Sequence, residues 1–134
     1  MRVYVDTNCY IDIFENRYDG YIPLAEFSYQ VFRRIRERGD SLIVSEWLEH
    51  ELDYNGHLDN YKDFIKDLKK DGVEVVHIKK TAEDKEKARS YQNKGDALQA
   101  ILAAKANADA LVTHNIKDFI ETEDLVKICP PREY

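Results

Sequence analysis

The chain has 134 residues, of which 43% are hydrophobic and 34% charged, and its net charge is −6. This length is typical of one compact domain, so we expect residues 1–134 to fold around one core as a single domain. No stretch approaches the roughly 18 apolar residues of a membrane span, and the acidic balance argues against binding nucleic acid through a broad basic surface, so we expect a soluble, cytoplasmic protein without membrane contact.

Five short apolar segments predict β-strands, because they are rich in branched and aromatic residues and are bounded by polar or turn-forming residues. They lie at residues 2–5, 41–44, 73–78, 110–113 and 125–129. The last of them is ended by Pro130 and Pro131, which cannot continue the hydrogen bonding of a strand.

Helical periodicity fills the intervals between these strands. Apolar residues from 24 to 35 share one face of a predicted helix that Gly39 can end, and residues 58–68 form a second such helix before Gly72. The small and apolar residues 97–104 predict a third helix that is largely buried. This alternation predicts an α/β fold, a three-layer α/β/α sandwich around a central, mostly parallel five-stranded sheet. In such sheets ligands bind beyond the carboxyl ends of the strands.

Asp6 directly follows the first predicted strand, so it lies at the carboxyl edge of the sheet. Thr7 and Asn8 come next and carry polar groups that can hold the Asp6 carboxylate in one orientation. In the alternative interpretation, Asp6 or Thr7 serves only as the N-cap of the following helix.

Glu51 belongs to a helix that begins after the second strand, where Ser45 is a natural N-cap. On a helical wheel Glu51 is adjacent to Leu48 and Leu52, which mark the side of the helix that faces the core. A carboxylate at the boundary of a core needs a partner or a metal ion. The alternative is an ordinary acidic residue on a solvated helix face.

Further acidic and polar residues fall near the fourth strand. Asp96 follows Gly95 and opens the predicted small-residue helix, and the next strand ends in Thr113, with Asn115 and Asp118 just beyond it. These side chains lie at the same carboxyl edge, beside the first strand, if the sheet is doubly wound. In the alternative interpretation Asp96 and Asn115 only cap helices and Asp118 is simply exposed.

Three or four carboxylates at one edge of a sheet repel one another. Two of them about 4 Å apart repel by roughly 4 kcal/mol at an effective dielectric constant of 20. Such a cluster persists through shifted pKa values or by binding a hard cation. A site with oxygen ligands alone favours Mg²⁺ or Mn²⁺, and the absence of any Cys-x-x-Cys pair argues against zinc.

Four segments of the chain, taken together and in order, resemble the PIN (PilT N-terminus) domain family. They are Val3-Tyr4-Val5-Asp6-Thr7-Asn8, then Ser45 with Glu51-Leu52, then Asp96-Ala97-Leu98 with Asp109-Ala110-Leu111-Val112-Thr113, and finally Thr113-His114-Asn115 with Lys117-Asp118-Phe119. The resemblance covers nearly the whole chain.

The resemblance implies a metal-dependent endoribonuclease that hydrolyses RNA phosphodiester bonds. The implied catalytic residues are Asp6, Glu51, Asp96 and Asp118, and the implied ligands of Mg²⁺ or Mn²⁺ are Asp6, Glu51, Asp96 and Asn115. Many members carry Asp where this chain has Asn115, and others have Asn there with an acid three residues on, so the choice between Asn115 and Asp118 stays open. Asn8 and Thr113 are supporting residues. By sequence position the basic residues nearest to the RNA are Lys94, Lys117 and His114, followed by Arg17 and Lys105.

Many PIN proteins resemble VapC-type toxins that a small antitoxin holds, so the resemblance also implies an antitoxin partner. The alternative function is a catalytically weak or inactive PIN-like module that binds protein or RNA. Residues 10–29 contain more aromatic side chains than one small core hides, which predicts a homodimer or a toxin–antitoxin complex. A phosphoryl-receiver domain is disfavoured because no second acid neighbours Asp6 and no Asp ends the third strand.

Overall fold

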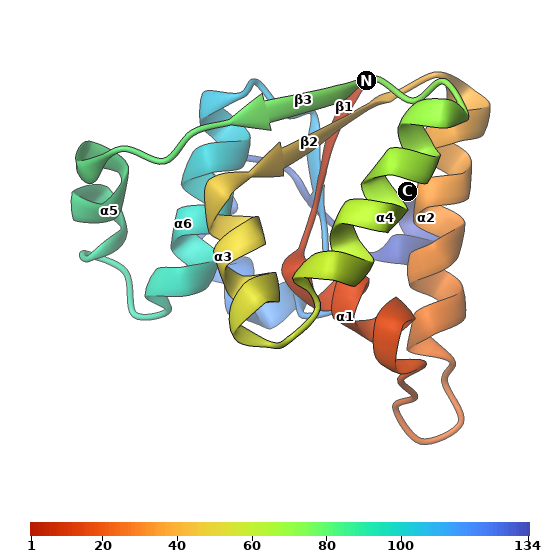
Figure 1. Ribbon diagram of the computed structural model, residues 1–134. Coiled ribbons are helices and arrows are strands. Elements are labelled where there is room, and N and C mark those ends of the chain that lie inside the picture. Colours follow the sequence, from red (N-terminus) through yellow and green to blue (C-terminus); the bar gives the residue numbers. More distant parts are fainter.

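Five strands form one sheet in the computed structural model, which describes all residues from 1 to 134 (Figure 1). The strands are β1 (Arg2–Val5), β2 (Ser41–Ser45), β3 (Val75–Ile78), β4 (Ala110–Val112) and β5 (Ile128–Cys129). Their spatial order is β3-β2-β1-β4-β5, and every neighbouring pair is parallel. The chain therefore winds outward from β1 to β3 and then returns to build β4 and β5 on the other side, as predicted for a doubly wound α/β fold.

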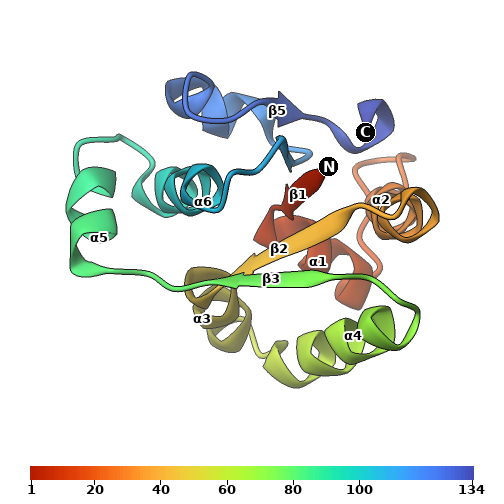
Figure 2. The same cartoon turned by 90° about the horizontal axis from the view of Figure 1, so that it is seen from above.

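Helices cover both faces of the sheet (Figure 2). On one face lie α1 (Thr7–Glu15), α2 (Leu24–Arg38), α3 (Glu46–Tyr54) and α4 (Leu58–Lys70). On the other lie α6 (Lys94–Lys105), α5 (Ala82–Ala88), which packs on α6, and the 3-10 helix η1 (Ile116–Thr122), while the short 3-10 helix η2 (Pro131–Glu133) contacts α2. This arrangement confirms the three-layer sandwich. None of the helices combines the length and the apolar character needed to cross a membrane.

The alternation of side chains along β1 explains why both faces are covered. Val3 and Val5 belong to the core shared with α1, α2, α3 and α4, whereas Tyr4 points into the second core, below α6 and η1. All three side chains are fully buried. Because successive residues of a strand point to opposite faces, a strand that is apolar at every position requires helices on both sides.

The two edge strands are shorter than predicted. β3 begins at Val75 rather than at residue 73, and β5 covers only Ile128–Cys129 rather than residues 125–129. Each pairs with one neighbour alone, and β4 is only three residues long, so β5 has no partner along which to extend. Helix α5 was not predicted, because only Asp84 and Ala88 are buried in it and no apolar period marks it. It begins at a capping box formed by Thr81 and Asp84.

The first core contains a buried hydroxyl group without a partner. Tyr10 is fully buried against the rings of Phe32, Tyr61 and Phe64, and its Oη accepts and donates no hydrogen bond. Tyr4, which is equally buried, differs in this respect, because its hydroxyl lies 2.8 Å from Ser45 Oγ.

We expect Tyr10→Phe to raise the free energy of unfolding by about 1 kcal/mol, because it removes a buried polar atom whose hydration is lost on folding. The matched change Tyr4→Phe should lower it by about 1 kcal/mol, since it breaks a hydrogen bond. Urea unfolding of both variants at one pH measures the difference. Similar losses of stability in the two variants would contradict the assignment of Tyr10 as unpartnered.

Candidate functional site

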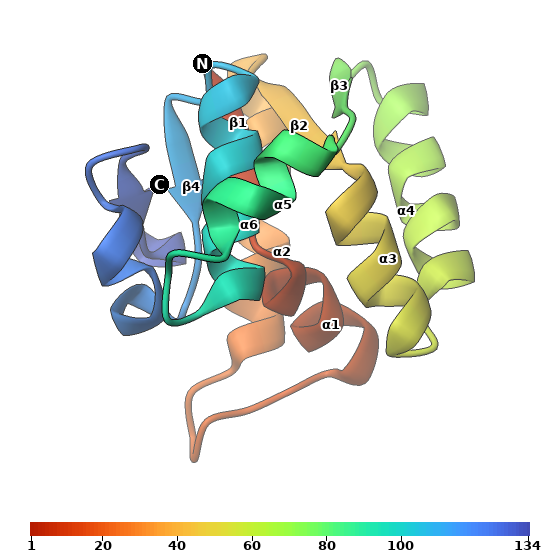
Figure 3. The ribbon, with the colours of Figure 1, turned by 90° about the vertical axis from the view of Figure 1, so that its left-hand side faces the viewer.

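The carboxyl edge of the sheet brings together residues from four segments. Asp6 follows β1 and is the N-cap of α1, Glu51 lies in α3 after β2, and Thr113 follows β4. Helix α6 leads back into β4, so its first turn, with Asp96, lies at the same edge. In Figure 3 the starts of α1 and α6 and the helix α3 approach one another below the sheet.

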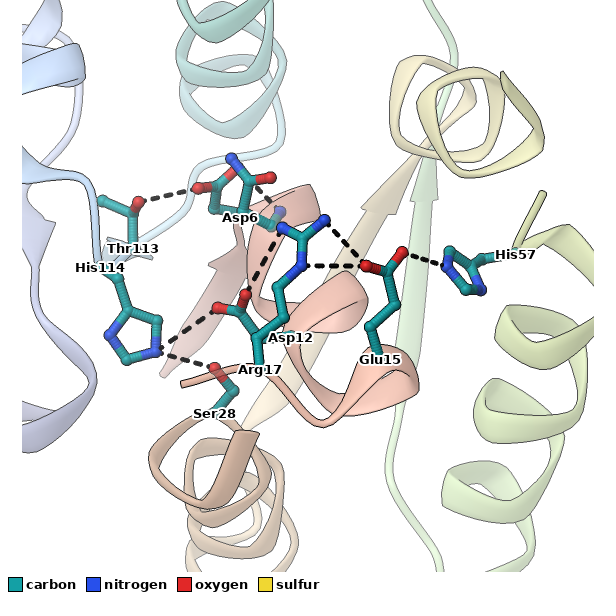
Figure 4. Close-up of polar contacts among 9 residues, drawn as sticks. Asp6, Asp12, Glu15, Arg17, Ser28, His57, Thr113 and His114 are labelled. Carbon is teal, nitrogen blue, oxygen red and sulfur yellow. Dashed lines mark hydrogen bonds and ion pairs between the residues drawn. The ribbon is translucent and has the colours of Figure 1, made fainter. Parts of the chain in front are cut away.

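Asp6 is fully buried, and three donors surround its carboxylate. Thr113 Oγ1 donates to Oδ2 at 2.8 Å (Figure 4), Gln99 Nε2 donates to Oδ1 at 2.9 Å, and the backbone N–H of Asn8 donates to Oδ1 at 3.4 Å. Burial raises the pKa of Asp6, and the bonds from Gln99 and Thr113 oppose this rise. Asp6 is therefore both a helix cap and a rigidly oriented carboxylate, and Asn8 acts on it through its backbone rather than its side chain.

Gln99 connects Asp6 with the other acids. It is 1% exposed, and its Nε2 also donates to Asp96 Oδ1 at 3.3 Å, while its Oε1 accepts from the backbone N–H of Thr7 at 3.1 Å. The Thr7 hydroxyl in turn donates to Glu51 Oε1 at 2.8 Å. One hydrogen-bond network thus joins three carboxylates from α1, α3 and α6.

The electrostatics of the site agree with this closeness. Burial raises the pKa of Glu51 to about 7, with further contributions from the charges of Asp6 and Asp96. Burial also raises the pKa of Asp96 to about 7, with contributions from Asp6 and Asp118. None of the first three acids forms a salt bridge with a lysine or arginine. Hydrogen bonds and protonation, rather than a neighbouring basic side chain, therefore offset their negative charges.

The chemistry of these side chains fits a hard divalent cation, since carboxylate oxygens are the ligands that Mg²⁺ and Mn²⁺ prefer. The acids do not form a closed cage, because no group of three or more acidic, histidine or cysteine side chains surrounds a common point. Instead the amide of Gln99 lies between Asp6 and Asp96 and supplies a partial positive charge there. A cation held by Asp6 and Asp96 would supply the positive charge that the amide supplies here.

Asp96 differs from its predicted place in the helix. Helix α6 begins at Lys94 with Asn93 as its N-cap, so Asp96 lies inside the first turn and the prediction that it opens the helix is wrong. The alternative of Asp96 as a simple N-cap is thereby removed. Gly95 also lies in this first turn, and its carbonyl accepts a hydrogen bond of 3.1 Å from Trp47 Nε1.

The structure separates the predicted fourth ligands. Asn115 precedes η1, and its backbone N–H donates to Thr113 Oγ1 at 3.0 Å. Asp118 is exposed in the first turn of η1, and its charge contributes to the raised pKa of Asp96. Asp118 is therefore electrostatically coupled to the acids, while Asn115 acts on Thr113, which holds Asp6.

Sequence reasoning missed Gln99 and the position of His114. Gln99 could have been noticed as a polar residue three positions after Asp96 in a helix that is otherwise apolar and buried on all sides. The position of His114 could not be predicted from the sequence. Its Nε2 lies 2.9 Å from Ser28 Oγ and 3.8 Å from Asp12 Oδ2 (Figure 4). Burial lowers the pKa of His114.

The other basic candidates lie in different places. Lys94 is exposed at the start of α6 and Lys117 is exposed on η1, both near the carboxyl edge. Lys105 is at the opposite end of α6 and forms a salt bridge with Asp84 at 2.9 Å. The prediction that Lys105 lies near the site is therefore wrong.

Comparison with known proteins identifies the family of this chain. The sequence matches the PIN domain family over residues 2–117. The chain belongs to the PIN domain family. The PIN domain is also similar in fold to a chain in the crystal structure of VapBC2 from Rickettsia felis bound to a DNA fragment from their promoter. That similarity has a TM-score of 0.62 and covers 97% of this chain and 98% of the other at 17% sequence identity. No curated protein matches the sequence.

We expect Asp96→Asn to raise the melting temperature of the metal-free PIN domain. The increase should be larger at about pH 8 than at about pH 5. The folded-state pKa of Asp96 is about 7 against an ordinary 3.8, so the unfolded chain releases this proton first and the folded state loses stability as pH rises between the two values. Asparagine does not titrate and removes that loss. Thermal melts in a chelator over this pH range measure the effect.

Asp59→Asn is the matched control, because Asp59 is an exposed acid in the first turn of α4. It should show no gain that grows with pH. A gain at Asp96 that is absent, or equal at all pH values, would mean that the pKa of Asp96 is not raised in the folded protein.

Proposed function

We propose that residues 1–134 act as one PIN nuclease domain, an endoribonuclease that depends on Mg²⁺ or Mn²⁺ and hydrolyses RNA phosphodiester bonds. The observation that carries this proposal is the gathering of Asp6, Glu51 and Asp96 at one edge of the sheet without a lysine or arginine partner. Membership of the PIN family supports it. Structural roles explain such a cluster poorly, because the burial and mutual repulsion of three carboxylates lower the stability of the fold.

The proposed role of each acidic residue follows from how deeply it is buried. Asp6 is held in one orientation by Thr113 and Gln99, so it presents a fixed oxygen ligand. Glu51 and Asp96 are only partly buried, so they can face a substrate as well as the ion. The cation would be held by Asp6, Glu51 and Asp96, with Asn115 nearby. When bound, it would neutralise the phosphate and lower the pKa of an attacking water.

Asp96→Asn should abolish RNA cleavage while leaving the protein folded. The substitution keeps the size of the side chain but removes one negative charge from the metal site and one of the two oxygens that accept from Asn93 Nδ2 and Gln99 Nε2. Both metal affinity and catalysis should therefore fall, the rate by at least about 100-fold. Cleavage of a generic single-stranded RNA in manganese is the measurement, and Asp59→Asn should cleave like the wild type. Wild-type cleavage by the Asp96 variant would remove this residue from the site.

Asp118→Ala should reduce cleavage more than Asn115→Ala does. A carboxylate contributes charge to the site that a neutral amide cannot supply, and the effect of Asp118 on Asp96 supports this order. Rates of both variants at saturating manganese provide the comparison. Equal losses, or a greater loss at Asn115, would make Asn115 the fourth ligand instead.

A partner protein is the second part of the proposal. The neighbour in fold is a chain of a VapBC2 structure, so we infer that this domain acts as the toxin of a toxin–antitoxin pair and associates with an antitoxin or with its own copy. The exposed side chains of Tyr21, Ile22 and Tyr29 support association. A domain that binds RNA or protein without cleavage is the alternative, and the cleavage test above distinguishes them.

A further inference from the structure

A pocket of about 500 Å³ opens between the loop that joins α1 to α2 and the segments that follow β4 and β5. The loop projects from the body of the molecule in Figures 1 and 3. Tyr18 and Phe27 give the pocket aromatic surfaces, Pro130 adds an apolar one, and Asn115, Asp19 and Arg132 add polar groups. This size lies within the range of small-ligand sites.

The walls of the pocket are held in place. Asp19 and Ile22 exchange two backbone hydrogen bonds of 2.9 Å, which close the tip of the loop, and the backbone N–H of Ala25 donates to the Arg17 carbonyl at its base. His114, on the opposite side, is held by a hydrogen bond of 2.9 Å between its Nε2 and Ser28 Oγ (Figure 4). The buried carboxylate of Asp12 lies 3.8 Å from both His114 Nε2 and Arg17 Nη1. The pocket is therefore a built feature of the fold.

The pocket and the carboxylates share one edge of the sheet. His114 and Asn115 line the pocket directly after Thr113, the residue that holds Asp6. Glu51 and Asp96 lie on the other side of Asp6, in α3 and α6. An RNA strand whose scissile phosphate lies at the carboxylates can therefore place a neighbouring nucleotide at the pocket.

The chemistry of the pocket suits a base better than a phosphate. Its charged side chains are one acid, Asp19, and one cation, Arg132, whose guanidinium carbon lies 5.8 Å from the centre of the Phe27 ring. A site for the RNA backbone needs several unpaired cations, which this pocket and the net charge of −6 do not supply. Unpaired bases are bound instead by stacking on aromatic rings and by hydrogen bonds to their edges. Tyr18, 59% exposed, is free to stack, and Asn115 and Asp19 can bond to a base edge.

We propose that this pocket binds one unpaired nucleobase of the RNA next to the cleaved bond, stacked against Tyr18 and Phe27. The inference rests on the proposed ribonuclease function and specifies its substrate as single-stranded at that position. It gives this acidic protein a source of RNA affinity that needs few positive charges, because stacking does not depend on the phosphates.

The test is the affinity of the metal-free protein for short single-stranded RNAs of A, C, G or U, measured by fluorescence anisotropy in a chelator. Tyr18→Ala should weaken the tightest of these complexes about tenfold, and Tyr18→Phe should retain the wild-type affinity because its ring still stacks. Tyr21→Ala is the matched control, since Tyr21 is on the same loop and fully exposed but does not line the pocket. It should bind like the wild type.

An abasic strand of the same length completes the comparison. The wild type and Tyr18→Ala should bind this strand equally, because it offers no base to stack. Equal affinity of the two proteins for normal RNA, or an equal loss on the abasic strand, would overturn the inference. If Tyr18→Ala changed the oligomeric state in light scattering and left RNA affinity untouched, the loop would be a protein contact and the inference would also fall.

Cleavage in manganese judges the proposed function separately. If binding depended on the base and on Tyr18 but no cleavage occurred, the base-binding pocket would be supported and the nuclease function refuted. If Tyr18→Ala cleaved RNA as the wild type does, the nuclease function would be supported and the base-binding pocket refuted.

Discussion

The buried carboxylate of Asp6 is the constraint on which the rest of the site depends. A charged group without solvent is costly unless it is fully hydrogen-bonded, and its partners come from Thr113 after β4, Gln99 in α6 and the backbone at the start of α1. Meeting that requirement fixes α6 against the central strand. The same bonds bring Asp96 close to Asp6. The need of the buried Asp6 carboxylate for hydrogen-bond donors therefore also brings the acids together.

Gln99 stabilises the arrangement of the acids without a metal ion. Its amide bonds to two carboxylates at once and, through Thr7, is linked to a third. This arrangement lowers the repulsion among the acids when no cation is present. A hard cation at this site would offer each carboxylate a stronger partner, so the network that stabilises the fold without metal would compete with metal binding.

The winding of the sheet explains why function collects at one edge. β1 lies at the centre, and the chain leaves it toward β2 on one side and returns to β4 on the other. Loops at the carboxyl ends therefore diverge around Asp6 and leave room for a ligand there. The α1–α2 loop and the residues after β5 extend that edge beyond β4, which places the Tyr18 pocket beside the carboxylates rather than on a remote surface.

The sequence by itself determined the layers of the fold and the main acids of the site. Strands that are apolar throughout and helices with one apolar face imply a covered parallel sheet, and Asp6, Glu51 and Asp96 stand at recognisable places relative to them. The edge strands were predicted too long, because each pairs on one side only, and α5 was not predicted, because a charged helix leaves little periodic signal. Only the tertiary structure decided that Gln99 bridges two acids, that Lys105 pairs with Asp84 away from the site, and that His114 is hydrogen-bonded to Ser28. These facts depend on contacts between residues far apart in the chain, and local spacing carries no information about such contacts.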